Sequence, residues 1–214
     1  MTINNQILVL GCGGHSRFLL GLLANLNIDA FGLIDLEDCW DDSEVIMDVP
    51  VVGSLSSIDR QYALGYRDIV LGIGDNHLRE RIFCQLRKMG FVFPNLIHPT
   101  ATVDATAVFG EGNVIGPRVI IGAQVVLGNN NIVNSGAVIE HQSVIGSHCH
   151  VSLSAILCGN VTIGDYVLLG ANSTVIDKVN VSNHTVLGAG GTLVCSTKLI
   201  GLTLVGCPAK EKVK

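Results

Sequence analysis

The chain has 214 residues, of which 48% are hydrophobic, only 5% are aromatic and 14% are charged. Glycine is abundant at 25 residues, yet proline contributes only 5, which excludes collagen-like and low-complexity disordered chains. A net charge of −5 with no basic stripe argues against nucleic-acid binding. No apolar run is long enough for a membrane span, and the first residues lack the basic and apolar regions of a signal peptide, so a cytoplasmic location is expected.

The chain changes character near residues 95–99. Eight of the ten aromatic residues and 19 of the 31 charged residues precede position 97. We therefore expect two domains, residues 1–95 and residues 96–214.

Residues 1–95 alternate strand and helix patterns. Strands are expected at Gln6–Leu10, Ala30–Ile34, Val49–Val52 and Asp68–Ile73, and helices after Ser16 and over Leu78–Met89. This order predicts a small Rossmann-like parallel sheet with its ligand site at the carboxyl ends of the strands. About 95 residues make only half of a dinucleotide fold, so we expect a single nucleotide rather than NAD.

From residue 97 onward the chain has a six-residue repeat. Every sixth position from Ile97 to Val205 is apolar in nineteen of nineteen cases, and a short side chain follows four residues later. This is the hexapeptide pattern of a parallel β-helix, in which three repeats make one coil. About six coils at a spacing of roughly 4.8 Å predict an uninterrupted rod roughly 30 Å long. Corner positions with positive φ are expected at Asn129, Asn130, Asn160 and Asn172.

The seven cysteines form no CxxC pair, and we expect them to behave as small buried hydrophobic residues. A zinc site is not expected either. His148 and His184 fall in one column of the predicted β-helix but lie two coils apart, with Tyr166 between them.

Several motifs add to the hexapeptide pattern. They are the turn Gly11 to His15, the segment Ile73 to Asn76, the block Asn134 to His141, the tripeptide His150 to Ser152 and the terminal Val205 to Lys210. Together they resemble the sialic-acid/bacillosamine type of sugar O- or N-acetyltransferase, within the left-handed β-helix acyltransferases. The resemblance covers essentially the whole chain. It implies a homotrimer that binds acetyl-CoA between neighbouring β-helices and a nucleotide-linked amino sugar in the N-terminal domain.

The resemblance also implies site residues. His141 matches the general base, and its position two residues after the inward-facing Ile139 points it away from the core. The family usually has Asp or Glu after this histidine, whereas this chain has Gln142, so help from Glu140 is considered. The residues matched to acetyl-CoA are His150, Ala171 and Ala189. The residues matched to the nucleotide sugar are Gly13, Gly14, His15, Asp35, Leu36 and Gly74.

His141 and His150 are separated by half of one coil and therefore project from opposite sides of the predicted prism. They can line one site only across a subunit boundary. The leading hypothesis is N-acetylation of a nucleotide-linked 4-amino-4,6-dideoxy sugar by direct attack on the thioester. Two alternatives stay open: O-acetylation of a hydroxyl, for instance on sialic acid, and a non-catalytic β-helix that binds a nucleotide sugar.

Overall fold

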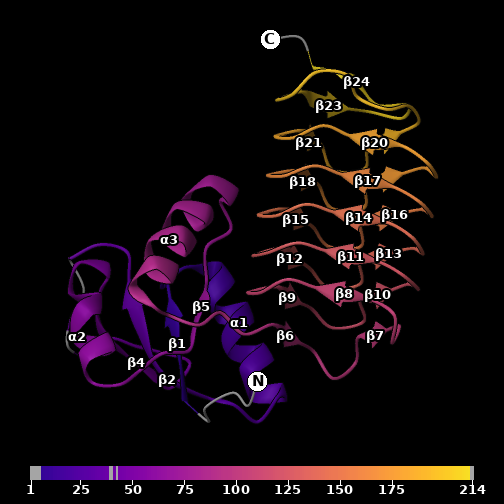
Figure 1. The fold of residues 1–214 in the computed structure, drawn as a ribbon. Helices are drawn as coiled ribbons and strands as arrows, with labels where there is room; N and C mark the ends of the chain where they lie inside the picture. Colours follow the sequence, from indigo (N-terminus) through magenta and orange to yellow (C-terminus); the bar gives the residue numbers. More distant parts are fainter. Residues whose placement is uncertain (1–5, 39–40, 42, 213–214) are drawn as a thin grey trace. The chain divides into compact units, whose positions relative to one another are not determined.

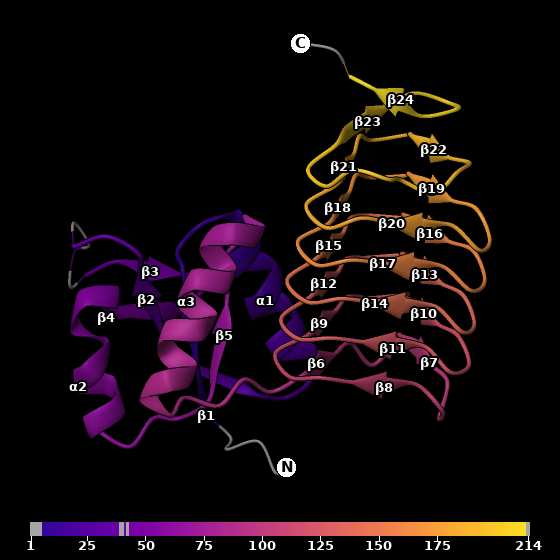
Figure 2. The ribbon, with the colours of Figure 1, turned by 45° about the horizontal axis from the view of Figure 1, so that its top comes forward.

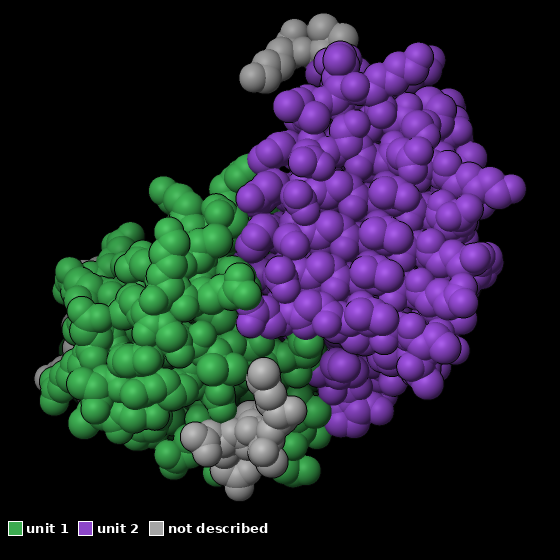
Figure 3. Space-filling model, in the orientation of Figure 1, with its two compact units in different colours: residues 1–96 green, residues 97–214 purple. Residues whose placement is uncertain are grey.

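The computed structural model describes residues 6–38, 41 and 43–212. The chain divides into two compact units, residues 1–96 and residues 97–214, which are coloured separately in Figure 3. No helix in the described part of the chain is long and apolar enough to cross a membrane.

The first unit is built on a five-stranded sheet with the order β3-β4-β2-β1-β5. Its strands are β1 (Gln6–Leu10), β2 (Asp29–Asp35), β3 (Val45–Ile46), β4 (Val49–Ser54) and β5 (Ile69–Leu71). Its α-helices are α1 (Gly14–Asn25), α2 (Ile58–Ala63) and α3 (Asn76–Met89), labelled in Figure 1, and the 3-10 turn η1 (Leu55–Ser57) precedes α2. Four strands are parallel, as the sequence predicts, but β3 pairs antiparallel with β4 in a short hairpin that it did not predict.

The core of the first unit forms where the apolar strands meet the helices. Leu8 and Leu10 of β1 are fully buried, together with Ile34 of β2 and Leu86 of α3. Continuous burial of a strand on both faces is the usual consequence of helices covering a parallel sheet. This arrangement leaves the carboxyl ends of the strands as the edge at which a ligand can approach.

The second unit is a left-handed parallel β-helix whose coils stack as separate rungs in Figures 1 and 2. Its three walls are called faces A, B and C here, in chain order. Face A contains β6 (Leu96–Ile97), β9 (Val114–Ile115), β12 (Ile132–Val133), β15 (His150–Val151), β18 (Leu168–Leu169), β21 (Val186–Leu187), β23 (Thr203–Val205) and β24 (Lys210–Glu211). Face B contains β7 (Thr102–Val103), β10 (Ile120–Ile121), β13 (Val138–Ile139), β16 (Ile156–Leu157), β19 (Thr174–Val175) and β22 (Thr192–Leu193). Face C contains β8 (Val108–Phe109), β11 (Val126–Leu127), β14 (Val144–Ile145), β17 (Thr162–Ile163) and β20 (Asn180–Val181).

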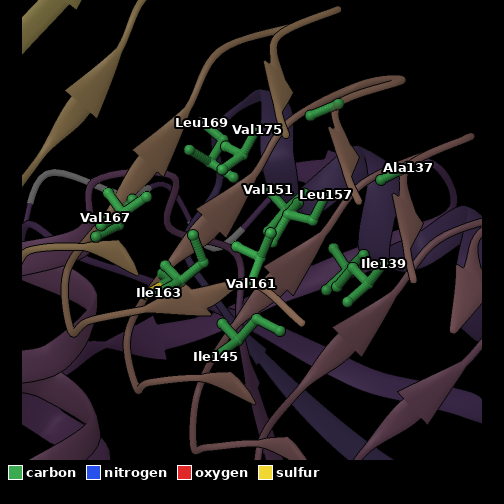
Figure 4. Close-up of a cluster of buried hydrophobic side chains, with 14 of the residues drawn as sticks. Ala137, Ile139, Ile145, Val151, Leu157, Val161, Ile163, Val167, Leu169 and Val175 are labelled. Atoms are coloured by element: carbon green, nitrogen blue, oxygen red, sulfur yellow. The ribbon is translucent and has the colours of Figure 1, made fainter. Parts of the chain in front are cut away.

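The six-residue repeat fills the interior of the β-helix. Every sixth residue from Ile115 to Leu193 is at most 3% exposed, and Figure 4 shows several of these side chains converging on the axis. Equivalent positions of consecutive coils pair with each other, as in Ile121 with Ile139 and Ile139 with Leu157. The predicted fold class is therefore confirmed.

The repeat does not continue to the end, which corrects the prediction of an uninterrupted rod. Leu199 and Val205, which the six-residue step places inside, are 65% and 41% exposed. Leu204 is buried instead, because the coil that joins β21 to β23 is one residue short and places Leu187 opposite Leu204. Side chains of a strand alternate between the inside and the outside of the β-helix, so one missing residue exchanges the inward and outward positions.

The corners use the left-handed backbone region. Asn130, Asn160 and Asn172 have φ between 54° and 59°, as predicted. Asn129 does not: its side-chain Oδ1 instead accepts the backbone N–H of Glu111 from the neighbouring coil. Larger side chains also occupy left-handed corners, among them Gln142 and Tyr166, each with φ 59°. Hydrogen bonds from the neighbouring coil stabilise such corners, for example Gln142 N–H donating to the Ala123 carbonyl at 2.8 Å.

Candidate functional site

The turn after β1 is fixed by close backbone contacts. Ser16 Oγ donates to the Gly11 carbonyl at 2.7 Å. A Cβ at Gly72 would lie 2.0 Å from that hydroxyl, so only glycine fits there. Gly13 and Gly14 differ, because a Cβ at either would meet no atom within 4 Å. The protein itself therefore does not require glycine at positions 13 and 14, and the space above them is open.

The N-terminus of α1 presents its first backbone N–H groups at this turn. The helix begins at Gly14, its N-cap Gly13 makes no side-chain cap, and no acidic residue stands in the first turn. His15 lies half-buried in that first turn, with its ring stacked on Phe18. Arg17 reaches back and donates to the carbonyls of Cys12 and Gly13 at 3.0 and 3.1 Å. The N–H groups of a helix start and a guanidinium favour a phosphate at this position.

Asp35 ends β2 next to the same turn. Partial burial, together with the negative charges of Asp35 and Glu44, raises the pKa of the Cys12 thiol to about 11. The thiol also hydrogen-bonds to the Asp35 side chain. Leu36, the other residue predicted here, is half-buried and packs against the core of the first unit. Of this pair, Asp35 is the one that offers hydrogen-bond acceptors to a ligand.

A polar cluster follows β4, the next strand along the sheet. Asp38 accepts hydrogen bonds from the hydroxyls of Ser54 and Ser56, the latter at 2.6 Å. These two bonds lower the pKa of the exposed Asp38 carboxyl, which stays ionised. No sequence pattern predicts this cluster, because the aspartate and the serines are far apart along the chain.

Gly74 follows β5 on the other side of β1. It is exposed, and a Cβ there would meet nothing within 4 Å. The loop that carries it is held by Arg79, which is 1% exposed and donates to the carbonyls of Ile73 and Gly74 at 3.2 Å and to Asn76 Oδ1 at 2.9 Å. Asp75 caps α3 by accepting the N–H of Leu78 at 2.7 Å. The sequence did not predict this role of Arg79, because an arginine in a predicted helix is ordinarily expected to be exposed.

The sheet order β4-β2-β1-β5 therefore places Asp38 and its serines, Asp35, the glycine turn and Gly74 after the ends of neighbouring parallel strands. Four parallel strands that end at one edge make the usual nucleotide-binding position of such sheets.

His141 lies at the corner between faces B and C, after β13 and before β14. It is exposed, and its Nδ1 lies 3.3 Å from Gln142 Oε1. Because an amide oxygen only accepts hydrogen bonds, this contact favours the neutral tautomer with the proton on Nδ1 and the lone pair on Nε2. Glu140 accepts the backbone N–H of His141 at 3.3 Å, and within the described residues it makes no hydrogen bond to the ring. Gln142 thus orients the ring, and Glu140 does not.

His150 is elsewhere in the same coil. It stands on face A in β15, between Ile132 and Leu168 of the adjacent coils. Face A is the wall opposite the corner between faces B and C. Within one chain, therefore, the structure does not bring His141 and His150 together.

Ala171 and Ala189 stack on successive coils at the corner between faces A and B. The N–H of Gly190 donates to the Ala171 carbonyl at 2.9 Å, and Ala189 is exposed. Gly170 lies so close to the next coil that a Cβ would be 2.5 Å from Ala189 N. The small side chains leave a smooth backbone strip on which an extended thin ligand can lie.

The third corner, between faces C and A, carries stacked rings. Tyr166 lies between His148 and His184, with ring centroids 5.3 and 4.6 Å apart, which confirms the expected separation of the two histidines. His148 Nδ1 lies 2.9 Å from the amide nitrogen of Asn130. Among residues 6–38, 41 and 43–212, no three side chains of the metal-binding types gather into one group.

The cysteines depart in part from the expectation of burial. Cys149 is 1% exposed, with its thiol donating to the Gly164 carbonyl at 3.1 Å, but Cys195 and Cys207 are exposed. Both lie beyond the last regular coil, where the repeat no longer points side chains inward. Cys39 lies outside the described residues.

Comparison with known proteins gives matches over the whole chain. Residues 6–86 match the family described as the PglD N-terminal domain. A crystal structure of PerB from Caulobacter crescentus in complex with CoA and GDP-perosamine is 31% identical, with a TM-score of 0.91 over 97% of each chain. A histidine-to-asparagine variant of the perosamine N-acetyltransferase of that organism, with the same two ligands, is 30% identical, with a TM-score of 0.92 over 98% of this chain and 97% of the other.

A third solved structure comes from a different organism. The acetyltransferase domain of PglB from Neisseria gonorrhoeae, in complex with acetyl coenzyme A, is 30% identical, with a TM-score of 0.88 over 98% of this chain and all of the other. No curated protein matches the chain by sequence.

Proposed function

The chain belongs to the hexapeptide-repeat sugar acetyltransferases with a PglD-type N-terminal domain, and from this we propose that it transfers an acetyl group from acetyl-CoA to the amino group of a nucleotide-linked 4-amino-4,6-dideoxy sugar. The family assignment makes the protein an acyltransferase that uses acetyl-CoA. The nature of the acceptor and the role of each residue are the proposal. The observation that carries it is the exposed His141, whose ring is oriented by Gln142 so that Nε2 is free to take a proton.

The first unit supplies the nucleotide site. The N–H groups at the start of α1, together with Arg17, favour the diphosphate. Asp35 offers carboxylate oxygens to ribose or base hydrogen-bond donors, and Gly13, Gly14 and Gly74 leave the room that a sugar nucleotide needs. Relatives at 30–31% identity bind GDP-perosamine, an amino sugar nucleotide, which supports this class of acceptor.

The β-helix supplies the acetyl-CoA site. The strip formed by Ala171 and Ala189 suits the pantetheine arm, because backbone groups are reachable there without intervening side chains. Acetyl-CoA supplies a thioester whose acyl carbon is open to a nucleophile. His150 is assigned to a position near that thioester, on the subunit next to the one that contributes His141.

His141 acts as the general base. Its Nε2 accepts a proton from the sugar amine as the amine nitrogen bonds to the acyl carbon. Gln142 Oε1 keeps the Nδ1 proton in place throughout and holds the ring in a single orientation. The carbon–sulfur bond then breaks, and the proton held on Nε2 neutralises the departing thiolate. Backbone N–H donors stabilise the negative charge that develops on the carbonyl oxygen.

A homotrimer is part of the proposal. His141 and His150 lie on opposite sides of one β-helix, so a site that uses both needs two copies of the chain. Apolar residues also stay exposed in columns on the outer walls: Val108, Val126 and Val144 on face C, and Ile120 and Ile156 on face B. Neighbouring copies would bury these columns. We assign the enzyme to the cytoplasm, because the six cysteines in the described part of the chain carry free thiols and acetyl-CoA is the donor.

The test is the release of CoA, followed with a thiol reagent. The panel contains acetyl-CoA with UDP-, GDP- and dTDP-linked 4-amino-4,6-dideoxy sugars, their 4-hydroxyl analogues and free sialic acid. We expect release with one amino sugar nucleotide and none with its hydroxyl analogue. If CoA is released with sialic acid alone, the proposed N-acetylation is wrong and O-acetylation takes its place. If no acceptor in the panel gives CoA release, a non-catalytic binding protein is favoured.

The His141→Ala variant completes the test. We expect kcat to fall by about 100-fold or more, in the range of a lost general base. The matched control is His98→Ala, because the His98 ring hydrogen-bonds to Thr100 at the start of the β-helix and its loss should leave turnover unchanged. Full activity of His141→Ala would remove His141 from the mechanism.

A further inference from the structure

Gly159 lies directly beside His141 on the next coil of the β-helix. The two positions are one full coil apart, and the N–H of the adjacent Asn160 donates to the His141 carbonyl at 2.8 Å. Gly159 is itself tied to the following coil, since its carbonyl accepts the N–H of Lys178 at 3.1 Å. The backbone on which the His141 side chain rests is therefore part of the regular coil.

The imidazole of His141 occupies the space that a side chain at position 159 would take. A Cβ on Gly159 would lie 2.6 Å from His141 Cε1, 2.7 Å from Nε2 and 3.3 Å from Nδ1. These are the three nearest atoms, and all belong to the ring. Any other residue at 159 would push the ring away and would place a methyl group against Nε2, the nitrogen assigned to accept the proton.

Neither the backbone nor the core explains this glycine. Gly159 is not among the residues with positive φ, so its conformation is open to any residue. It is only partly buried, and its side of the chain faces away from the prism axis. The requirement for glycine comes from the imidazole.

Gly122 shows the contrast. A Cβ at that position would lie 2.7 Å from the backbone nitrogen of His141 and 3.1 Å from the carbonyl carbon of Glu140. Gly122 is thus required for two coils to approach each other, whereas Gly159 leaves room for one side chain.

We propose that Gly159 is a positioning residue for His141, an inference that rests on His141 being the general base of the proposed function. Gly159 provides the surface on which the ring lies, and Gln142 Oε1 fixes the rotation of the ring through Nδ1. The two contacts together define one direction for the Nε2 lone pair. A small displacement of a catalytic group is costly, because the reacting atoms must meet at close to their contact distance.

The experiment uses Gly159→Ala in the full-length enzyme. We expect kcat to fall about 10- to 100-fold, as for a displacement of the base by roughly 1 Å. The KM for acetyl-CoA and the thermal midpoint should stay close to wild type, within about 2 °C for the latter. In the His141→Ala background, Gly159→Ala should have no further effect, because the two residues act as one unit.

Two variants serve as controls. Gly21→Ala changes an α1 glycine whose Cβ would meet nothing within 4 Å, and should leave kcat at the wild-type value. Gly122→Ala should lower the thermal midpoint, because the clash there is with backbone. The NMR signal of His141 Cε1–H, assigned by its loss in His141→Ala, should shift in Gly159→Ala and stay in place in Gly21→Ala.

The outcomes separate the two proposals. If His141→Ala is inactive while Gly159→Ala keeps wild-type kcat and an unshifted imidazole signal, Gly159 has no positioning role and the proposed function stands. If Gly159→Ala loses thermal stability as Gly122→Ala does, its role is structural and the inference is wrong. If His141→Ala stays active, the proposed function fails first.

Discussion

At the scale of single residues, the chemistry depends on what stands beside His141. Gln142 gives a hydrogen bond to Nδ1 at 3.3 Å but no negative charge, and Glu140 accepts the backbone N–H of His141. In the proposed mechanism, the imidazolium would therefore be oriented by an amide rather than by a carboxylate.

Gln142→Glu should move the acidic limb of the kcat/KM profile to higher pH, by about one unit. A carboxylate beside Nδ1 favours the charged ring, so a higher pH is needed before the base is neutral. The measurement is the pH profile with the amino sugar nucleotide. Gln142→Leu is the matched variant: it removes the hydrogen bond and should lower kcat with no such displacement. An unmoved profile in Gln142→Glu would show that residue 142 does not contact the working base.

Cys12 is the second residue with a defined chemical state. Burial and the charges of Asp35 and Glu44 raise the pKa of its thiol to about 11, so it stays protonated at neutral pH and donates to Asp35. We expect iodoacetamide at pH 8 to modify Cys195 and Cys207 well before Cys12, because the thiolate is the reactive form. Peptide mass spectrometry measures the order. Asp35→Asn removes one of the charges and should speed the modification of Cys12. Equal rates of Cys12 modification in the wild-type protein and in Asp35→Asn would contradict the contact between the Cys12 thiol and Asp35.

At the scale of elements, the neighbouring loops that follow β1 and β5 contain two kinds of glycine. Gly72 has no room for a side chain, since a Cβ there would lie 2.0 Å from Ser16 Oγ. Gly11 is tightly packed as well, with a Cβ 3.1 Å from the Gly72 carbonyl oxygen, and its φ of +108° disfavours any side chain. Gly13 and Gly74 face open space. The first kind packs the helix against the sheet, and the second kind leaves open the space in which the proposed nucleotide sugar would bind.

Gly74→Ala and Gly72→Ala should therefore separate binding from stability. Gly74→Ala should raise the KM for the sugar nucleotide by about tenfold, a loss of about 1.4 kcal/mol, with an unchanged thermal midpoint. Gly72→Ala should cost about 1–3 kcal/mol of folding free energy through overpacking against Ser16. Steady-state kinetics and thermal unfolding measure the two effects. Wild-type stability of Gly72→Ala would contradict the packing role of Gly72. A wild-type KM of Gly74→Ala would contradict the binding role of Gly74.

Inside the β-helix, Asn131 joins three coils. Its Oδ1 accepts the buried N–H of Cys149 at 2.7 Å, and its Nδ2 donates to Asn113 Oδ1 and the Gly146 carbonyl, each at 3.0 Å. Asn131→Val removes the side-chain partner of the Cys149 N–H and of the Gly146 carbonyl, whereas Asn113 Oδ1 still accepts the backbone N–H of residue 131. The free energy of unfolding should fall by about 1–3 kcal/mol for each buried group that loses its hydrogen bond. Denaturant unfolding measures the loss. Asn160→Ser is the control, because Asn160 is an exposed corner residue. Equal unfolding free energies in the two variants would show that the internal asparagine is not needed.

At the scale of the whole molecule, the proposed sharing of each active site between two copies of the chain gives a quantitative prediction. His141→Ala and His150→Ala should each be inactive alone, because each lacks one side of every site. After the two are unfolded together and refolded at equal amounts, about one quarter of the sites would join an intact His141 to an intact His150. Turnover should return to about that fraction of wild type. Analytical sedimentation should give the mass of a trimer. If trimers that contain both variants recover no activity, the two histidines do not act across a subunit boundary.

The sequence by itself determined the β-helix and the outward direction of the corner that carries His141. A strict six-residue repeat of large apolar side chains is buried only when the chain forms a β-helix with these side chains inside. Ile139 must therefore point inward and His141 outward. The glycine turn and the strand ends at Asp35 and Gly74 were also readable, because parallel strands end at one edge.

Only the tertiary structure decided which groups stand beside those residues. Two contacts join positions whose separation follows no local period: Arg79 with the loop at Gly74, and Asp38 with Ser54. A third, between Gly159 and the His141 ring, depends on the direction in which the histidine side chain points. The end of the repeat was hidden in the same way: a coil shortened by one residue keeps its apolar composition while its side chains exchange inside for outside. Periodicity fixes the direction of a side chain relative to its own backbone, whereas its neighbours depend on how distant segments pack.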